Sequence, residues 1–228
     1  MKTPVLIAIV VVVALLAFGL YQALVVAPTD QLQGDVYRII YYHVPSAWTA
    51  FLLFFVNFCA SIWYLFRRDS ISDAIAVTTA EIGVVFCTIV LITGPIWARP
   101  VWGIWWTWDA RLTSTLLMWL IYISYLILRR FSTGGQTPLL AAALAVFGFA
   151  DVPFVYLSIR YFRTQHPQPV IGGGGKLDPG MLHIMLYNWL AFVALAALLC
   201  WFRYQLERKQ KDVEETIALE SLLEGSPR

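Results

Sequence analysis

The 228-residue sequence contains three histidines, and each could bind a metal ion through a neutral imidazole. His43 lies in the run YRIIYYHVP, His166 lies in the run RTQHP, and His183 follows an Asp-Pro pair. Taken singly, a histidine is more often a hydrogen-bonded structural residue than a ligand. Neutral imidazole is nevertheless a common protein ligand of transition metals, including the iron of haem. The three histidines are therefore candidate ligands, provided that the fold brings at least two of them together.

Tryptophan is concentrated in one short segment of the chain. Five of the ten tryptophans lie in residues 97–108, within the run WARPVWGIWWTWDARLT. Tryptophans that anchor helices at a membrane surface are distributed over many helix ends. A dense cluster instead favours a large, flat, apolar ligand, because indoles stack on planar π-systems.

Arginines accompany this cluster, since Arg99 and Arg111 flank it and Arg38 lies upstream near His43. Guanidinium groups bind carboxylates in bidentate geometry. A flat ring, two carboxylates and an iron that takes imidazole ligands together describe haem. The candidate haem-binding residues are Trp102, Gly103, Trp105, Trp106, Trp108 and Asp109, with Arg38, Arg99 and Arg111 as candidate propionate partners. Asp109 is expected to order its loop, by accepting backbone N–H bonds or by pairing with Arg111.

The composition indicates which kind of fold must position these residues. Hydrophobic residues make up 60% of the chain and charged residues only 13%, which excludes disorder and simple soluble folds. The net charge of +2 does not suggest a nucleic-acid partner. The three cysteines (Cys59, Cys87 and Cys200) lie in apolar runs and form no CxxC motif, which excludes a disulfide framework, a cysteine zinc site and covalent haem attachment.

Six apolar stretches approach or exceed the roughly 20 residues that a membrane-spanning helix needs. They cover residues 5–27, 46–66, 74–97, 113–128, 139–162 and 181–202. The first is much longer than the apolar core of a signal peptide, so a retained helix is expected. The predicted fold class is an all-α integral membrane protein, a bundle of six transmembrane helices.

The distribution of Lys and Arg predicts the orientation of this bundle. Ten of them flank one set of helix ends and six flank the other, which places both termini in the cytoplasm. Segments 28–45, 98–112 and 163–180 then form the outer loops, and the glycine run at 172–175 predicts a flexible loop. We expect a membrane domain at 1–202 and a cytoplasmic tail at 203–228, which is either a solvated helix or a docking surface.

Two acidic residues fall inside the predicted spans, Glu81 in the third and Asp151 in the fifth. Acidic groups in a membrane are costly and indicate a functional role by default. They could form an ion or proton path, or each could be protonated or hydrogen-bonded within the bundle. We favour the second interpretation, because no further acidic residues continue a path.

The residues from 102 to 113 resemble the tryptophan-rich WWD motif of haem-handling membrane proteins. Together with the run YRIIYYHVP and the six spans, they make the region 34–202 similar to the CcmC family of bacterial cytochrome c maturation. This resemblance implies two axial haem ligands. His43 matches the first, and His166, in the run RTQH before Asp178-Pro179, matches the second. His183 has no counterpart in the family pattern.

The resemblance also implies a function and partners. A member of this family holds b-type haem transiently and non-covalently on the periplasmic face of the inner membrane and passes it to the haem chaperone CcmE. The implied partners are CcmE, the small membrane protein CcmD, and the transporter subunits CcmA and CcmB. We expect no enzymatic activity, because no nucleophile–base pair is recognisable among the outer residues.

Two other functions remain open at this point. A haem permease would need a polar route through the bundle, for which only Glu81 and Asp151 are candidates. A membrane oxidoreductase that uses b-type haem and quinone usually holds haem between histidines within its spans, and no histidine lies in the middle of a predicted span.

Overall fold

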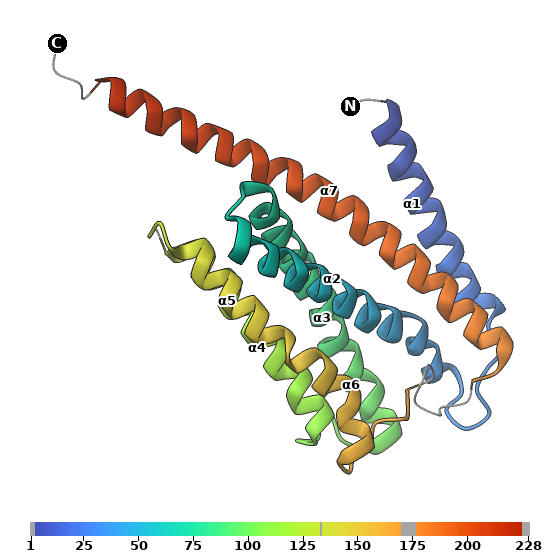
Figure 1. The fold of residues 1–228 in the computed structure, drawn as a ribbon. Helices are drawn as coiled ribbons and strands as arrows, with labels where there is room; N and C mark the ends of the chain where they lie inside the picture. Colours follow the sequence, from blue (N-terminus) through green and yellow to red (C-terminus); the bar gives the residue numbers. More distant parts are fainter. Residues whose placement is uncertain (1–2, 133, 170–176, 225–228) are drawn as a thin grey trace.

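A computed structural model describes residues 3–132, 134–169 and 177–224, and these are nearly all helical (Figure 1). Six helices are long and apolar enough to cross a membrane, which confirms the predicted fold class. The elements are α1 (Thr3–Tyr21), a π-helical turn η1 (Gln22–Val26), a 3₁₀ turn η2 (Asp35–Ile39), α2 (Ile40–Arg67), α3 (Ser70–Trp102), α4 (Ala110–Phe131), α5 (Thr137–Phe149), α6 (Asp151–Tyr161) and α7 (Pro179–Glu224). The glycine run at 172–175 lies outside the described residues.

The helices α2 and α3 form the middle of the bundle, with α4, α5 and α6 on one side and α7 on the other (Figure 1). Phe54 of α2 and Tyr122 of α4 stack in this core with ring centroids 3.7 Å apart. Gly83 of α3 makes room for Phe54, because a Cβ at this position would approach the phenyl ring to 2.7 Å. The helix α1 packs against α7, where the buried Asn188 side chain lies against Gly19.

Two of the helix ends that differ from the sequence prediction concern candidate site residues. The second span was predicted to begin at residue 46, but η2 continues directly into α2, so His43 lies in the first turns of a helix. The third span was predicted to end at residue 97, but α3 continues to Trp102 despite Pro95 and Pro100. Gly103 ends it with a left-handed conformation (φ 78°), which glycine adopts without a steric penalty.

The fifth predicted span is divided into α5 and α6 at Ala150. Pro153 explains this break, because proline lacks the N–H that would bond the carbonyl of residue 149, and its ring crowds that carbonyl. Asp151 is the first residue of α6. Its Oδ2 atom is buried and has no hydrogen-bond partner among the described residues.

The last helix, α7, has 46 residues and is therefore about 70 Å long, roughly twice the thickness of a bilayer's hydrocarbon core. Its C-terminal part leaves the bundle (Figure 1). The expected tail from residue 203 onward is thus a continuation of the last spanning helix through Glu224.

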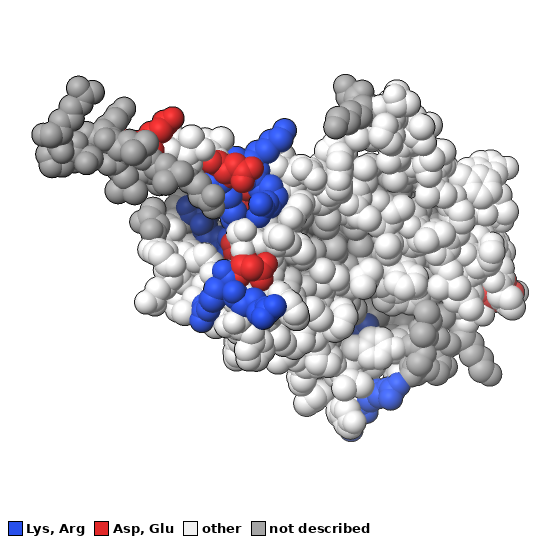
Figure 2. Space-filling model, turned by 45° about the horizontal axis from the view of Figure 1, so that its top comes forward, with Lys and Arg blue, Asp and Glu red and all other residues white. Residues whose placement is uncertain are grey.

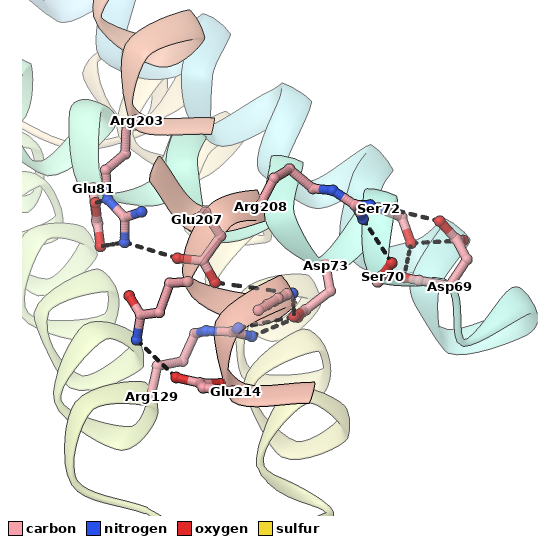
Figure 3. A network of polar contacts seen from close by, with 12 residues as sticks. Asp69, Ser70, Ser72, Asp73, Glu81, Arg129, Arg203, Glu207, Arg208 and Glu214 are labelled. Carbon is pink, nitrogen blue, oxygen red and sulfur yellow. Dashed lines mark hydrogen bonds and ion pairs between the residues drawn. The ribbon is translucent and has the colours of Figure 1, made fainter. Parts of the chain in front are cut away.

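An ionic network joins α7 to α3 and α4 where α7 leaves the bundle (Figure 3). Asp73 of α3 accepts two bonds from Arg129 of α4, at 2.6 and 2.9 Å, and one from Lys211 of α7 at 2.6 Å. The Asp73 side chain is only 6% exposed. A carboxylate buried to this extent needs both cations, because charges removed from water must be paired.

Glu81 belongs to the same network. It accepts hydrogen bonds from Arg203 of α7, and Arg203 also pairs with Glu207 at 2.9 Å. The interpretation of Glu81 as a group bonded within the bundle is therefore supported, and the ion-path interpretation is not.

The charged side chains gather mainly around this exit point of α7, on the face that Figure 2 shows. A smaller group of basic residues lies apart from it, and the surface between the two groups is almost free of charge. This separation is the pattern expected of an apolar belt that lies in a membrane.

Candidate functional site

Two histidines from separate segments of the chain lie close together at the end of the bundle opposite the ionic network. His43 belongs to α2 and His166 to the non-helical segment that follows α6, and their ring centroids lie 6.5 Å apart. Metal–imidazole bonds of about 2.0–2.1 Å place the ring centroids of two opposed ligands roughly 6 Å apart. The pair therefore has the spacing of two ligands on opposite sides of one metal ion.

The protonation of His43 follows from its hydrogen bonds. Its Nδ1 atom lies 2.8 Å from the Thr93 hydroxyl oxygen. That hydroxyl has one hydrogen, which it donates to the Ile89 carbonyl at 2.7 Å. His43 Nδ1 must therefore be the donor in the His43–Thr93 bond, and its Nε2 atom retains a free lone pair.

A hydrogen bond to the backbone of the next residue fixes the protonation of His166 in the same way. Its Nδ1–H donates to the Pro167 carbonyl at 2.8 Å, so Nε2 is again the unprotonated nitrogen. Burial of the imidazole, together with the positive charge of Arg111, lowers the pKa of His166 to about 3. A lowered pKa keeps the ring neutral at physiological pH, and the neutral ring is the form that binds iron.

Two adjoining cavities meet at the histidine pair. The smaller one is lined by residues of α2, α3 and α4 as far as Cys87 and Met118. The larger one is also lined by Asp30, Leu32 and Gln33 and by residues 167–169. Seven residues line both, namely His43, Ala47, Phe51, Gly94, Trp97, Arg111 and His166. A ligand lying between the two rings could thus extend into both cavities.

In the tryptophan cluster, Trp97 lines both cavities, and the other four tryptophans fall into two groups. Trp102 and Trp106 line the smaller cavity, where the buried Nε1 atom of Trp106 has no hydrogen-bond partner among the described residues. Trp105 and Trp108 are 58% and 76% exposed and line neither cavity. Gly103, which the sequence places among them, forms the turn that separates α3 from this loop.

The three candidate arginines also have different surroundings. Arg111 lines both cavities and donates to the Val155 carbonyl at 3.3 Å. Arg38 instead donates to backbone carbonyls of residues 23 and 27 and to Asp35, so it ties η1 to η2. Arg99 donates to the Gly103 carbonyl at the end of α3. Only Arg111 of the three borders the cavities.

Asp109 caps the N-terminus of α4 by accepting the Leu112 N–H at 2.9 Å. Its Oδ2 atom accepts hydrogen bonds from Thr107 at 3.1 Å and from Thr164 at 2.6 Å. The described residues show no ion pair between Asp109 and Arg111. Of the two roles expected for Asp109, the structure therefore shows the first, the acceptance of a backbone N–H.

His183 does not join this group. It lies on α7 with an exposed side chain and lines neither cavity. The described residues contain no cluster of three or more His, Cys, Asp or Glu side chains that would form a different metal site. The two-histidine arrangement is thus the one that the fold assembles.

The family described as Heme exporter protein C matches residues 1–218 of this chain. The chain belongs to the Heme exporter protein C family. It is 38% identical over 186 residues to a Heme exporter protein C of Bradyrhizobium diazoefficiens, covering 80% of this chain and 70% of the relative. It is 33% identical over 198 residues to one from Escherichia coli K12 (84% and 80%) and 30% identical over 203 residues to one from Haemophilus influenzae (88% and 82%).

Membership in the Heme exporter protein C family confirms the family resemblance that was inferred from the WWD run and the histidine contexts. The family comprises membrane subunits for haem export and not enzymes, which agrees with the sequence prediction.

Sequence reasoning did not find two side chains of the site. Thr164 is visible only as part of the run RTQHP, and nothing in the sequence assigns it a contact. No sequence pattern links Thr93 to His43, because Thr93 lies 50 residues from the histidine that it orients.

Proposed function

We propose that this chain binds haem between His43 and His166 and delivers it to a haem chaperone for the maturation of c-type cytochromes. The observation that carries this proposal is the pair of imidazoles whose ring centroids lie 6.5 Å apart at the junction of two cavities. Both rings have Nδ1 engaged and Nε2 free. Haem is the cargo, bound non-covalently and held transiently.

Other side chains at the cavities would bind the rest of the haem. Trp102 and Trp106 supply apolar and aromatic surface for the ring. The Arg111 guanidinium and the unpartnered Trp106 N–H are donors that suit a propionate carboxylate. These three residues, together with the histidines, account for the ring, its iron and a carboxylate.

The proposal places the chain in the bacterial inner membrane with the site on the periplasmic face. The partner that receives the haem would be CcmE, with CcmD, CcmA and CcmB as further members of the assembly. The support is membership in the Heme exporter protein C family and the position of the ionic network, rich in Lys and Arg, at the opposite end of the bundle.

The visible absorption spectrum of the purified protein, titrated with haem, tests this function. We expect one haem per chain, with the Soret and visible bands of a low-spin iron that has two histidine ligands. A spectrum of free or high-spin haem would overturn the proposal. Reversible reduction of the bound haem by a quinol would instead favour the oxidoreductase, and haem uptake by vesicles that contain this chain alone would favour the permease.

The proposed orientation predicts which positions are accessible from the periplasm. In a variant whose native cysteines are replaced by alanine, Gln31→Cys should react with a membrane-impermeant thiol reagent in intact spheroplasts. Gly135→Cys, in the connection between α4 and α5 at the opposite end, should react only in inverted vesicles. The reverse pattern would place the haem site in the cytoplasm.

The division of the tryptophans predicts two classes of variant. Trp106→Leu should weaken haem binding, because it removes both a ring that lines the cavity and the unpartnered N–H, and we expect roughly a tenfold loss of affinity. The double variant Trp105→Leu/Trp108→Leu should retain haem binding in a titration of the purified protein. If the double variant loses haem and Trp106→Leu does not, the exposed pair is the haem-binding surface.

A further inference from the structure

We propose that Asp109 positions the iron ligand His166 through the hydroxyl of Thr164. This contact joins the tryptophan-rich loop to the segment that carries His166, and we call the Asp109–Thr164–His166 connection the clasp. This inference rests on the proposed function, because it assigns a role to side chains that are not themselves expected to touch haem. Asp109 and Thr164 are positioning residues in this sense.

The ligand segment has no helix to hold it. Residues 162–169, which follow α6, form no regular structure, whereas His43 is fixed within α2. Within this segment, the His166 N–H donates to the Thr164 hydroxyl oxygen at 3.0 Å, which closes a turn of three residues. This contact sets the backbone at His166, while the bond to Pro167 sets its ring. The position of Thr164 therefore determines where the imidazole lies.

Thr164 is in turn anchored by a charged group. Its hydroxyl donates to Asp109 Oδ2 at 2.6 Å, across 55 residues of sequence. Because the hydroxyl already accepts the His166 N–H, one oxygen atom connects the ligand's backbone to the Asp109 carboxylate. Hydrogen bonds to a carboxylate are shorter and stronger than those between neutral groups.

The Asp109 carboxylate is itself well fixed. Its Oδ1 atom accepts the Leu112 N–H at the start of α4, where a negative charge is also favoured by the helix dipole. Its Oδ2 atom accepts the Thr107 hydroxyl within the tryptophan loop as well as the Thr164 hydroxyl. The rigid end of α4 thus holds the ligand segment through a single side chain.

A protein that must both bind and release haem needs one of its two ligands to be able to leave the iron. The ligand on α2 cannot move without the helix, but His166 can leave the iron when one hydroxyl–carboxylate contact opens. The Asp109–Thr164 contact therefore sets how long haem remains bound with two ligands.

Conservative variants of purified, full-length protein test the clasp. Thr164→Val removes the hydroxyl and preserves the shape of the side chain, whereas Thr164→Ser retains the hydroxyl. We expect Thr164→Val to release haem about tenfold faster, as is typical when a supporting contact of a metal ligand is lost. Part of its iron should change from low-spin to high-spin. Thr164→Ser should resemble the wild type in both measurements.

Two further variants separate positioning from general damage. Asp109→Asn retains a good helix cap but replaces one carboxylate oxygen by an amide NH₂, so it should resemble Thr164→Val. Thr107→Val removes a hydroxyl from the same carboxylate oxygen without touching the ligand segment, and should resemble the wild type. Added imidazole should restore the low-spin spectrum of Thr164→Val, because the cavity is intact and only the ligand is displaced.

Several outcomes would overturn the inference. They are a Thr164→Val variant with the wild-type spectrum and release rate, a Thr107→Val variant as impaired as Thr164→Val, and a failure of imidazole to restore the spectrum. If the wild type itself holds no low-spin haem, or if His166→Ala retains it, the proposed function fails instead. The two failures are therefore distinguishable.

Discussion

Replacing either His43 or His166 by alanine should abolish the low-spin spectrum of bound haem, whereas His183→Ala should leave it unchanged. Each of the first two changes removes one of the two proposed Nε2 ligand atoms and leaves an iron with at most one histidine ligand. The described residues offer no other imidazole at the cavities, because His183 lies on α7 and lines neither of them.

The measurement is the absorption and electron paramagnetic resonance spectrum of each variant after addition of haem. The variants His43→Ala and His166→Ala should give high-spin signals that added imidazole converts back to low-spin. His183→Ala serves as the matched control. A low-spin signal that survives His166→Ala but disappears in His183→Ala would show that the ligands are His43 and His183, and would contradict the site described above.

Asp73 lies at the end of the bundle opposite the site, and replacing it by asparagine should strongly destabilise the protein. Asp73 is the shared partner of Arg129 and Lys211, and its side chain is 6% exposed. Removing one member of a buried ion pair leaves a buried charge without compensation, which costs about 3–5 kcal/mol. We expect a clearly lower unfolding temperature in detergent, with haem binding retained at low temperature because the network is remote from the cavities.

Asp69, four residues before Asp73, provides a matched control for this prediction. Asp69 caps the same helix by accepting the Ser72 N–H at 2.9 Å, and asparagine is an equally good cap, so Asp69→Asn should unfold like the wild type. The double variant Asp73→Asn/Arg129→Gln should be less destabilised than the sum of its two single changes. Equal unfolding temperatures of Asp73→Asn and Asp69→Asn would show that the network contributes little to stability.

The sequence alone was sufficient to predict the fold class and the family. A membrane-spanning helix needs only a run of apolar residues of a given length, and such runs are local properties of the chain. The WWD run and the context of His43 are equally local, so the resemblance could be recognised without coordinates. Helix ends were predicted less well. Pro45 lies inside α2 and Pro100 inside α3, although a proline removes a backbone hydrogen bond from a helix interior and usually marks a break.

The tertiary structure decided which of the candidate residues border the two cavities. Tryptophans adjacent in sequence point in different directions, so Trp106 borders a cavity while Trp105 and Trp108 are exposed. The three arginines were equivalent in the sequence, but only Arg111 borders the cavities, since contacts with distant backbone carbonyls engage Arg38.

The tertiary structure was also needed to bring together the two proposed ligands and the residues that hydrogen-bond to them. The sequence alone left three histidines, and family likeness favoured two of them, but their spacing of 6.5 Å depends on how α2 packs beside the segment after α6. The hydrogen bonds from His43 to Thr93 and from Thr164 to Asp109 join residues 50 and 55 positions apart. No local pattern encodes such contacts, because they arise only when the packing of α2, α3 and α4 brings separate parts of the chain together.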